Sequence, residues 1–289
     1  MGNSANLEAL GIGKITKEWI SRVEEKKARI QLEISRGAQI IPAQWMQYGS
    51  GNQALYEQAL KNKELIQEYK DVFQHGSSSI SNLEVRDFER LAEFIEFSYY
   101  HTQSRAKEAQ ATGEKILEKC FDEEGHDTKM ATAAFLGQSY YVSGELDKAV
   151  HLFDIVIDEF NPVTDTGIAL KYGIDPLVFA LAQKGLIAVL RADCNTAFSL
   201  FEECLEYAKS EKNLTRLQFG YLYTICFFAY TEEKDKCKQY LSELRNVVGD
   251  VMDVLIASFP KISEGWATDD LSLAEESRDF ILKEGQSVA

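Results

Sequence analysis

The chain has 289 residues, 45% hydrophobic and 27% charged, which is the composition of a folded protein rather than a disordered one. It contains no run of 18 apolar residues and no apolar N-terminal core, so we expect neither a membrane span nor a signal peptide. The formal net charge is −15, and residues 120–289 hold 29 Asp and Glu against 15 Lys and Arg. This acidic half should repel nucleic acid and anionic lipid. It either complements a basic partner or is a solvated exterior that keeps the protein in solution.

The N-terminal part of the sequence predicts a flexible segment followed by helices. Residues 1–13 are small and contain glycine, so we expect them to be flexible. Residues 14–122 should form an N-terminal helical region, in which 14–35 is a highly charged helix with one narrow apolar stripe. Apolar residues at helical spacing predict three further helices in this region, at 53–74, 88–101 and 104–120.

The central part of the sequence, residues 128–248, contains an internal repeat. Its best copy, between residues 130 and 163, holds Leu136, Gly137, Tyr140, Gly144, Ala149, Phe153 and Pro162. In identity and spacing these residues resemble the tetratricopeptide repeat. The resemblance implies an all-α fold in which antiparallel helical hairpins stack as a tetratricopeptide-like α-solenoid. It also implies that Gly137 faces Ala149 at the closest approach of two helices and that Gly144 makes the turn between them.

Two weaker copies follow the first repeat. In one, Gly185, Ala197 and Phe201 repeat the glycine, alanine and phenylalanine spacing, with helices expected near 176–192 and 195–210. The other has Cys237 and Leu241 at the small and bulky positions, with helices near 214–230 and 234–248. The aromatic run 221–230 is taken as part of a buried helix, because no segment shows sustained period-two alternation.

Residues 249–289 should form C-terminal capping helices. The last helix is expected near 269–283, beginning with a capping box at Ser272 and Glu275 or earlier, at Asp269 and Asp270. Proline is scarce in the chain, as a long helical protein requires, and we expect each proline to lie between elements. The four prolines are Pro42, Pro162, Pro176 and Pro260.

The sequence lacks the motifs that usually carry chemistry. It contains no phosphate-binding loop, zinc-binding helix or nucleophile elbow, and its four histidines are scattered. We therefore expect no enzymatic activity, no metal and no cofactor. The chain begins like an N-myristoylation site at Gly2, but Asn6 stands where Ser or Thr is preferred.

The five cysteines include no C-x-x-C pair, and each falls at an apolar position of a helical pattern. We expect them to be small buried residues of a protein in a reducing compartment, the cytoplasm or the nucleus.

The tetratricopeptide resemblance also implies a binding face, because the first helix of each hairpin lines the groove of such arrays. The candidate partner-binding residues on that face are Gln138, Tyr141, Phe179, Phe219 and Tyr230, with Ala134, Ala182, Leu186, Leu222 and Cys226 beside them. An apolar groove of this kind suits an extended hydrophobic segment or a helix. The alternative is that one of the chain's own terminal helices fills the groove.

The expected function is a non-enzymatic scaffold or adaptor subunit that mediates protein–protein interactions within a larger complex. Its partners should be basic or present an apolar helix, without direct binding of nucleic acid. The alternative is a peptide-responsive regulator that binds a short ligand in the groove.

Overall fold

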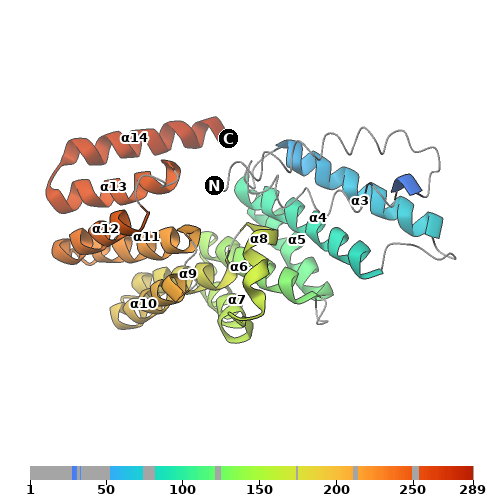
Figure 1. Ribbon diagram of the computed structural model, residues 1–289, viewed down its shortest axis with the longest axis horizontal. Helices are drawn as coiled ribbons and strands as arrows, with labels where there is room; N and C mark the ends of the chain where they lie inside the picture. Colours follow the sequence, from blue (N-terminus) through green and yellow to red (C-terminus); the bar gives the residue numbers. More distant parts are fainter. Residues whose placement is uncertain are drawn as a thin grey trace. The chain divides into compact units, whose positions relative to one another are not determined.

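The computed structural model (Figure 1) describes residues 28–30, 33, 53–73, 82–120, 125–173, 175–210, 214–248 and 254–288. All elements in these ranges are helical, which confirms the predicted all-α class for this part of the chain. The segment 1–13, predicted to be flexible, and most of the helix predicted at 14–35 lie outside the described residues. Among the described helices, none is long and apolar enough to cross a membrane.

The helices follow one another closely along the chain. Their bounds are α3 Gln53–Phe73, α4 Asn82–Thr102, α5 Ala106–Lys119, α6 His126–Val142, α7 Leu146–Glu159, the 3₁₀ turn η2 Asp165–Gly167, α8 Ile168–Tyr172, α9 Pro176–Leu190, α10 Cys194–Ser210, α11 Leu214–Tyr230, α12 Lys234–Val248, α13 Val254–Thr268 and α14 Leu271–Val288.

The chain divides into two compact units. Unit 1 comprises Met1–Ser143 and Phe160–Ile174, and unit 2 comprises Gly144–Glu159 and Asp175–Ala289. In unit 1, α4 and α5 form an antiparallel hairpin, with α3 packed on α4 and α5 packed on α6. Unit 2 contains the hairpins α9–α10, α11–α12 and α13–α14, and each packs against the next. Consecutive helices therefore pack as sequential hairpins within each unit.

One turn geometry recurs between the helices. Five residues with positive φ precede the second helix of a pair: Ser104 at 56°, Gly144 at 80°, Ala192 at 58°, Glu232 at 61° and Asp269 at 61°. A backbone hydrogen bond closes the turn in each of the four hairpins named above. It runs from Arg105 N–H to Tyr100 O (2.9 Å), Asp193 to Ala188 (2.9 Å), Glu233 to Phe228 (2.9 Å) and Asp270 to Gly265 (2.8 Å). This bond spans five residues and satisfies a carbonyl that the end of the first helix would otherwise leave unpaired.

A small side chain stands five residues after each of these turn residues. These side chains are Ala109, Ala149, Ala197 and Cys237, all buried, and the half-buried Ala274. The sequence prediction included Ala149, Ala197 and Cys237, and the structure extends the pattern to α5 and α14. A small residue at this point leaves room for the first helix of the hairpin.

The close contact in two hairpins pairs one glycine with one phenylalanine. In α9–α10, a Cβ on Gly185 would lie 2.8 Å from the ring of Phe201, so the ring packs directly on the glycine backbone. The same two positions in α4–α5 hold Phe97 on the first helix and Gly113 on the second, and a Cβ on Gly113 would lie 3.1 Å from Phe97. The large and small residues have exchanged helices, and the space between the helices is filled in both cases.

Two predictions about the C-terminal region are wrong. Pro260 lies inside α13 rather than between elements, and the sequence reading did not delimit this helix. Helix α13 packs on α11, α12 and α14. This packing stabilises the helix by more than the loss of the backbone hydrogen bond that proline cannot make. The capping box at Ser272 is also wrong, because α14 begins at Leu271. Its cap is Asp270, one of the two residues named for an earlier start, whose Oδ1 accepts a hydrogen bond from Leu273 N–H (3.2 Å).

Two further features differ from expectation. Helix α4 begins at Asn82 rather than at Phe88, and Cys194 is exposed because it is the first residue of α10. The other four cysteines are buried or half-buried, as predicted. Between α7 and α9, the chain forms η2 and the short helix α8.

Candidate protein-interaction surface

In unit 2, the first helices of the three hairpins lie next to one another, since α9 contacts α11 and α11 contacts α13. The predicted partner-binding residues Phe179 and Phe219 lie on α9 and α11, and both are half-buried. Their neighbours Leu186 and Cys226 are also half-buried, whereas Ala182 and Leu222 are buried. The face therefore contains partly accessible apolar side chains on two adjacent helices.

A polar contact joins α9 to α11 beside this apolar face. The amide Nε2 of Gln183 donates a hydrogen bond to the hydroxyl of Tyr223 (3.1 Å). Gln183 is buried and Tyr223 is half-buried, so this bond is shielded from water and helps to hold the two helices in register.

The N-terminus of α9 is fixed by a buried carboxylate. Asp175 caps the helix by accepting a hydrogen bond from Val178 N–H (3.0 Å), and it forms a buried ion pair with Arg216 of α11. The hydroxyl of Tyr207 on α10 donates to the same carboxylate (3.3 Å). Burial raises the pKa of Asp175, against the lowering effect of the Val178 N–H and of Arg216. This cluster ties three helices together and is not accessible enough to act on a ligand.

Tyr230 differs from the other predicted partner-binding residues. It is the last residue of α11, and 65% of its surface is exposed, beside the turn to α12. It therefore lies at the end of the hairpin rather than among the half-buried aromatic residues of the face.

In unit 1, the predicted residues Gln138 and Tyr141 lie on α6 and are half-buried. The Oε1 of Gln138 is 2.9 Å from Nε2 of His101, at the end of α4, and Nδ1 of His101 is 2.7 Å from Oγ of Ser139. Burial lowers the pKa of His101 below 6.5, although the hydrogen bond to Gln138 acts in the opposite direction. A neutral imidazole thus joins α4 to α6, and Gln138 is engaged within the unit.

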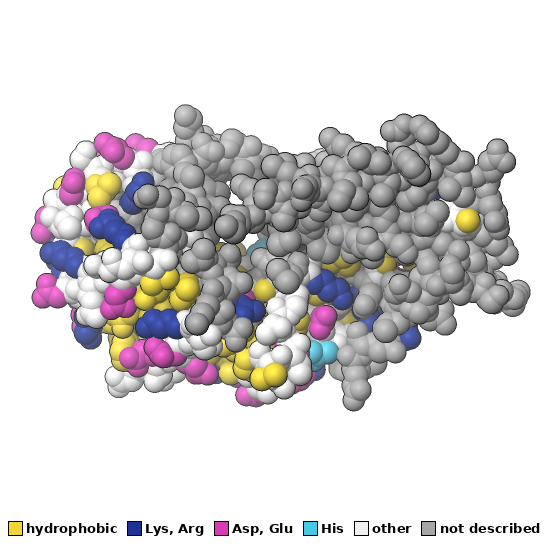
Figure 2. All heavy atoms as spheres, in the orientation of Figure 1, with side chains coloured by type: hydrophobic (Ala, Val, Ile, Leu, Met, Phe, Trp, Pro, Cys, Tyr) yellow, Lys and Arg dark blue, Asp and Glu magenta, His cyan; other side chains and the backbone are white. Residues whose placement is uncertain are grey.

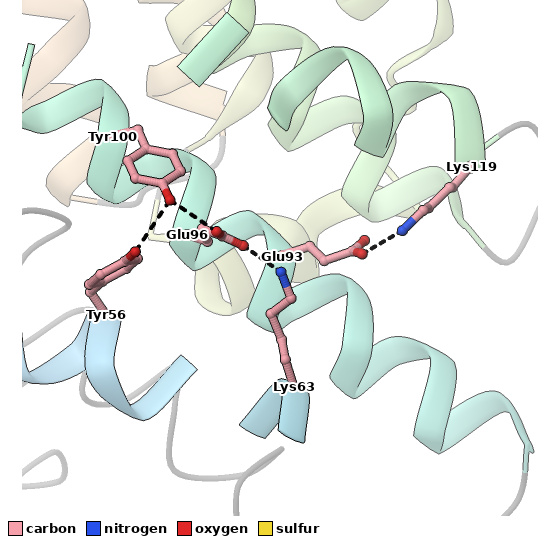
Figure 3. Close-up of polar contacts among 6 residues, drawn as sticks. All are labelled: Tyr56, Lys63, Glu93, Glu96, Tyr100 and Lys119. Carbon is pink, nitrogen blue, oxygen red and sulfur yellow. Dashed lines mark hydrogen bonds and ion pairs between the residues drawn. The ribbon is translucent and has the colours of Figure 1, made fainter. Parts of the chain in front are cut away.

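Polar side chains also connect α3 to α4 (Figure 3). The Nζ of Lys63 lies 2.5 Å from Oε2 of Glu96, and the hydroxyl of Tyr100 donates to Oε1 of the same carboxylate (3.1 Å). The hydroxyls of Tyr56 and Tyr100 are 3.2 Å apart. The hydrogen bond with Tyr56, burial and the charge of Glu96 all raise the pKa of Tyr100, so its phenol stays protonated. These groups hold two helices together and offer no activated nucleophile.

A second ion pair on α4 faces the next helix. The Nζ of Lys119 on α5 lies 2.5 Å from Oε1 of Glu93, as Figure 3 also shows. Glu93 and Glu96 thus bind lysines from opposite neighbours of α4. These polar side chains hold neighbouring helices together. The sequence alone does not predict the network, because its members come from three different helices.

Most residues of the best repeat lie on α6 and α7. Leu136, Gly137 and Tyr140 are buried on α6, and Ala149 and Phe153 are buried on α7. Gly144 has the positive φ of the turn, and Pro162 is exposed after α7. The predicted contact of Gly137 with Ala149 would join unit 1 to unit 2, and it stays a prediction.

The segment that follows α7 docks on α6 through two contacts that the sequence did not reveal. Nε2 of His126 lies 2.8 Å from Oδ2 of Asp165, and the hydroxyls of Thr128 and Tyr172 are 2.7 Å apart. Burial raises the pKa of Asp165, but the Asn161 N–H and His126 outweigh it and leave the pKa lowered. Residues 165–172 are therefore an integral part of unit 1.

Within the described ranges, no group of three or more His, Cys, Asp or Glu side chains could hold a metal ion. Comparison of the chain with protein-family models gave no match, and comparison with curated proteins and with solved structures gave none either.

Proposed function

We propose that the chain is a non-enzymatic scaffold or adaptor subunit whose hairpins stack as a tetratricopeptide-like α-solenoid. The observation that carries this proposal is the recurrence of one hairpin turn at Ser104, Gly144, Ala192, Glu232 and Asp269. Repetition of one structural unit creates equivalent surface positions on successive helices, and repeat proteins use such continuous surfaces to bind other proteins.

The half-buried aromatic residues of the first helices support a binding role for this surface. Phe179 and Phe219 occupy equivalent positions on α9 and α11, and Tyr141 lies on α6 of unit 1. Aromatic side chains that are only partly covered in the free protein are the type that anchors interfaces. We propose Phe179 and Phe219 of unit 2 as anchors and a segment with apolar side chains as their ligand.

The charge of unit 2 favours a basic partner rather than nucleic acid. The unit holds 24 Asp and Glu against 13 Lys and Arg. Such an excess attracts positively charged proteins and accelerates their association. All five cysteines are free thiols, which fits the cytoplasm or the nucleus as the place where the complex assembles.

The experiment is affinity purification of the tagged full chain from its own cells, with quantitative mass spectrometry of the proteins that remain bound. Phe219→Ala should reduce the affinity for a stable partner by about 2 kcal/mol, roughly 30-fold in Kd. Val247→Ala is the matched control, because Val247 is an exposed apolar residue at the far end of α12.

Three results would contradict the proposal. Recovery of no partner would exclude the scaffold role. An equal loss of affinity in Val247→Ala would show that the face of Phe179 and Phe219 is not the binding surface. A steep fall in melting temperature for Phe219→Ala, with binding lost only through unfolding, would show that Phe219 is core and that the chain fills its own groove.

A further inference from the structure

Three of the four large apolar side chains that are exposed in the described part of unit 2 lie at hairpin turns. Leu190 is the last residue of α9 and is 57% exposed, and Tyr230 is the last residue of α11 and is 65% exposed. Leu271, the first residue of α14, is 72% exposed. The fourth, Val247, lies at the opposite end of α12. Exposed apolar side chains are therefore concentrated at one end of the hairpins.

The three turns lie side by side. The Nζ of Lys234, after the α11–α12 turn, is 2.5 Å from Oδ1 of Asp269 in the α13–α14 turn. Phe198, near the start of α10, packs on Phe228 near the end of α11, with ring centroids 5.9 Å apart. The Nζ of Lys236 lies over both rings, at 5.6 and 4.9 Å from their centroids. We call residues 190–194, 230–235 and 269–272 the turn edge.

The turn edge is strongly acidic. Its carboxylates are Asp193, Glu232, Glu233, Asp235, Asp269 and Asp270, all of them exposed residues. Its basic residues are Arg191 and Lys234, which pair with carboxylates at 2.6 Å (Asp147) and 2.5 Å (Asp269). Lys236, one residue beyond the edge, pairs with Glu233 at 2.8 Å. Figure 2 shows apolar side chains among charged ones on the visible face of the C-terminal helices. The edge thus offers apolar contacts surrounded by excess negative charge.

We propose that the turn edge binds a basic amphipathic α-helix of a partner protein. This proposal rests on the scaffold function and assigns a second surface, separate from the face of Phe179 and Phe219. The apolar side chains of the bound helix contact Leu190, Tyr230 and Leu271, and its Lys and Arg side chains pair with the surrounding carboxylates. Charge complementarity selects this occupant, since an acidic or neutral helix brings no positive charge to this excess of carboxylates.

The spacing of the hairpins fits a helix laid along the edge. Helices that pack directly on one another have axes about 8–10 Å apart. Leu190 and Tyr230 end two such neighbours, α9 and α11. A helix rises about 10.5 Å over seven residues, which is close to this spacing. Side chains at every seventh position of a bound helix can therefore contact successive hairpins. The ligand should therefore carry apolar residues with a seven-residue repeat.

The test uses a synthetic helical peptide of ~18 residues, about 27 Å long. It carries Leu at every seventh position and Lys on both flanks, and its binding to the full chain is measured by fluorescence anisotropy. The Tyr230→Ala, Leu271→Ala double variant should bind at least about tenfold more weakly. Val247→Ala, the matched exposed apolar residue away from the edge, should bind as the parent does. Both variants should keep the melting temperature of the parent, since the replaced side chains are exposed.

A charge comparison tests the electrostatic part of the proposal. Glu232→Gln with Asp235→Asn should weaken binding severalfold and flatten its dependence on salt, because attraction between exposed charges is screened by ions. Glu202→Gln with Glu203→Gln is the control, since it removes the same charge from the middle of α10, away from the turns. A peptide with Glu in place of Lys should not bind.

Several outcomes would overturn the proposal. These are absence of binding by the basic peptide, equal binding by the acidic peptide, and equal weakening by Val247→Ala. If the chain sediments as a dimer that Tyr230→Ala with Leu271→Ala dissociates, the edge joins two copies of the chain and the proposal fails. The two proposals can fail separately. If the peptide does not bind but Phe219→Ala still loses a co-purified partner, the turn-edge proposal is wrong and the scaffold function is supported.

Discussion

The contact between Gly185 and Phe201 gives the sharpest test of the hairpin packing. Adding a single methyl group in Gly185→Ala places a carbon 2.8 Å from two atoms of the Phe201 ring. Attractive carbon contacts lie at about 3.5–4.0 Å, so the ring must retreat by roughly 0.7 Å or more. Phe201 is fully buried and its centroid is 5.3 Å from that of Phe227, so it has little space for this movement.

The expected magnitude follows from two opposing effects. Overpacking a filled core costs about 1–3 kcal/mol. Replacing glycine by alanine inside a helix returns about 1 kcal/mol through helix propensity. Gly185→Ala should therefore reduce the free energy of unfolding by up to about 2 kcal/mol, and the melting temperature should fall by a few degrees.

Two other glycines calibrate this effect. A Cβ on Gly167 would meet nothing within 4 Å, so Gly167→Ala should be nearly neutral. A Cβ on Gly265 would lie 2.7 Å from Asp270 O and Ala274 N, which are backbone atoms and cannot rotate away. Gly265→Ala should therefore be the most destabilising of the three. Thermal unfolding followed by circular dichroism measures all three variants under one condition.

The prediction is tested by the order of stability of the three variants, with Gly167→Ala the most stable and Gly265→Ala the least. If Gly185→Ala melts above the temperature of the parent, the added methyl group meets no clash large enough to offset its gain in helix propensity, and the close contact of α9 with α10 is wrong. A double variant, Gly185→Ala with Phe201→Leu, distinguishes a clash from a general loss of packing. The two changes should be less destabilising together than the sum of their separate effects, with a coupling of about 0.5–3 kcal/mol.

Three further predictions concern buried polar groups and thiols. Protonation of His101 is disfavoured in the folded state, so the free energy of unfolding should be fully retained above its usual pKa of 6.5. It should fall as the pH is lowered below 6.5, by at most about 1.4 kcal/mol per pH unit. His101→Gln should remove this pH dependence in melting experiments. Arg216→Met should cost about 3–5 kcal/mol because it leaves the buried Asp175 carboxylate without its positively charged partner, and adding Asp175→Asn should recover much of the loss. Purely additive losses in urea unfolding would contradict a coupled pair. Cys194 should be the thiol that reacts first with iodoacetamide, because burial raises the pKa of Cys204 to about 12 and those of Cys226 and Cys237 to about 11; mass spectrometry of labelled peptides measures this, and first labelling at another cysteine would contradict it.

The sequence predicted the α9–α10 hairpin well because its signature residues are local and specific. Gly185, Ala197 and Phe201 fix the point where the two helices meet, and the structure places the Phe201 ring directly on Gly185. The helix bounds expected at 214–230 and 234–248 also agree with α11 and α12. Apolar periodicity and a few small residues therefore determine most of the fold.

The sequence of α4–α5 allows a degenerate repeat, but no signature residues can be aligned in it because the residues in its contact are exchanged. Phe97 stands where the other hairpin has Gly185, and Gly113 stands where it has Phe201. A search for glycine followed by a bulky residue cannot find this arrangement, although the combined volume is the same. Ala109, five residues after Ser104, was the remaining signal, and it corresponds to Ala149, Ala197 and Cys237.

The candidate site was less predictable than the fold. The pattern placed Phe179 and Phe219 on one face, but it could not show that Tyr230 is the exposed end of α11. Nor could it show that Gln138 is engaged by His101, since the two residues are 37 positions apart in the chain. Exposure and long-range polar contacts depend on how the helices pack, and that information is not local in sequence.

The recurring turn yields a last prediction, in which exchanges between glycine and alanine act through the backbone. Ala192 has a φ of 58°, a left-handed conformation that costs an L-residue about 1–2 kcal/mol. Gly144 has a φ of 80° in the corresponding turn, and a Cβ there would meet nothing within 4 Å. Glycine adopts this conformation without strain. Glycine also has more conformational freedom in the unfolded chain, and this reduces the gain in stability by about 0.4–1 kcal/mol.

Ala192→Gly should therefore raise the free energy of unfolding by about 0.5–1 kcal/mol, and Gly144→Ala should lower it by a similar amount. Urea unfolding of the two variants beside the parent measures both changes. Steric crowding cannot explain a loss in Gly144→Ala, because the space around this glycine is open. If both variants were destabilised, or both were neutral, the two turns would not share the left-handed geometry on which the hairpin repeat depends.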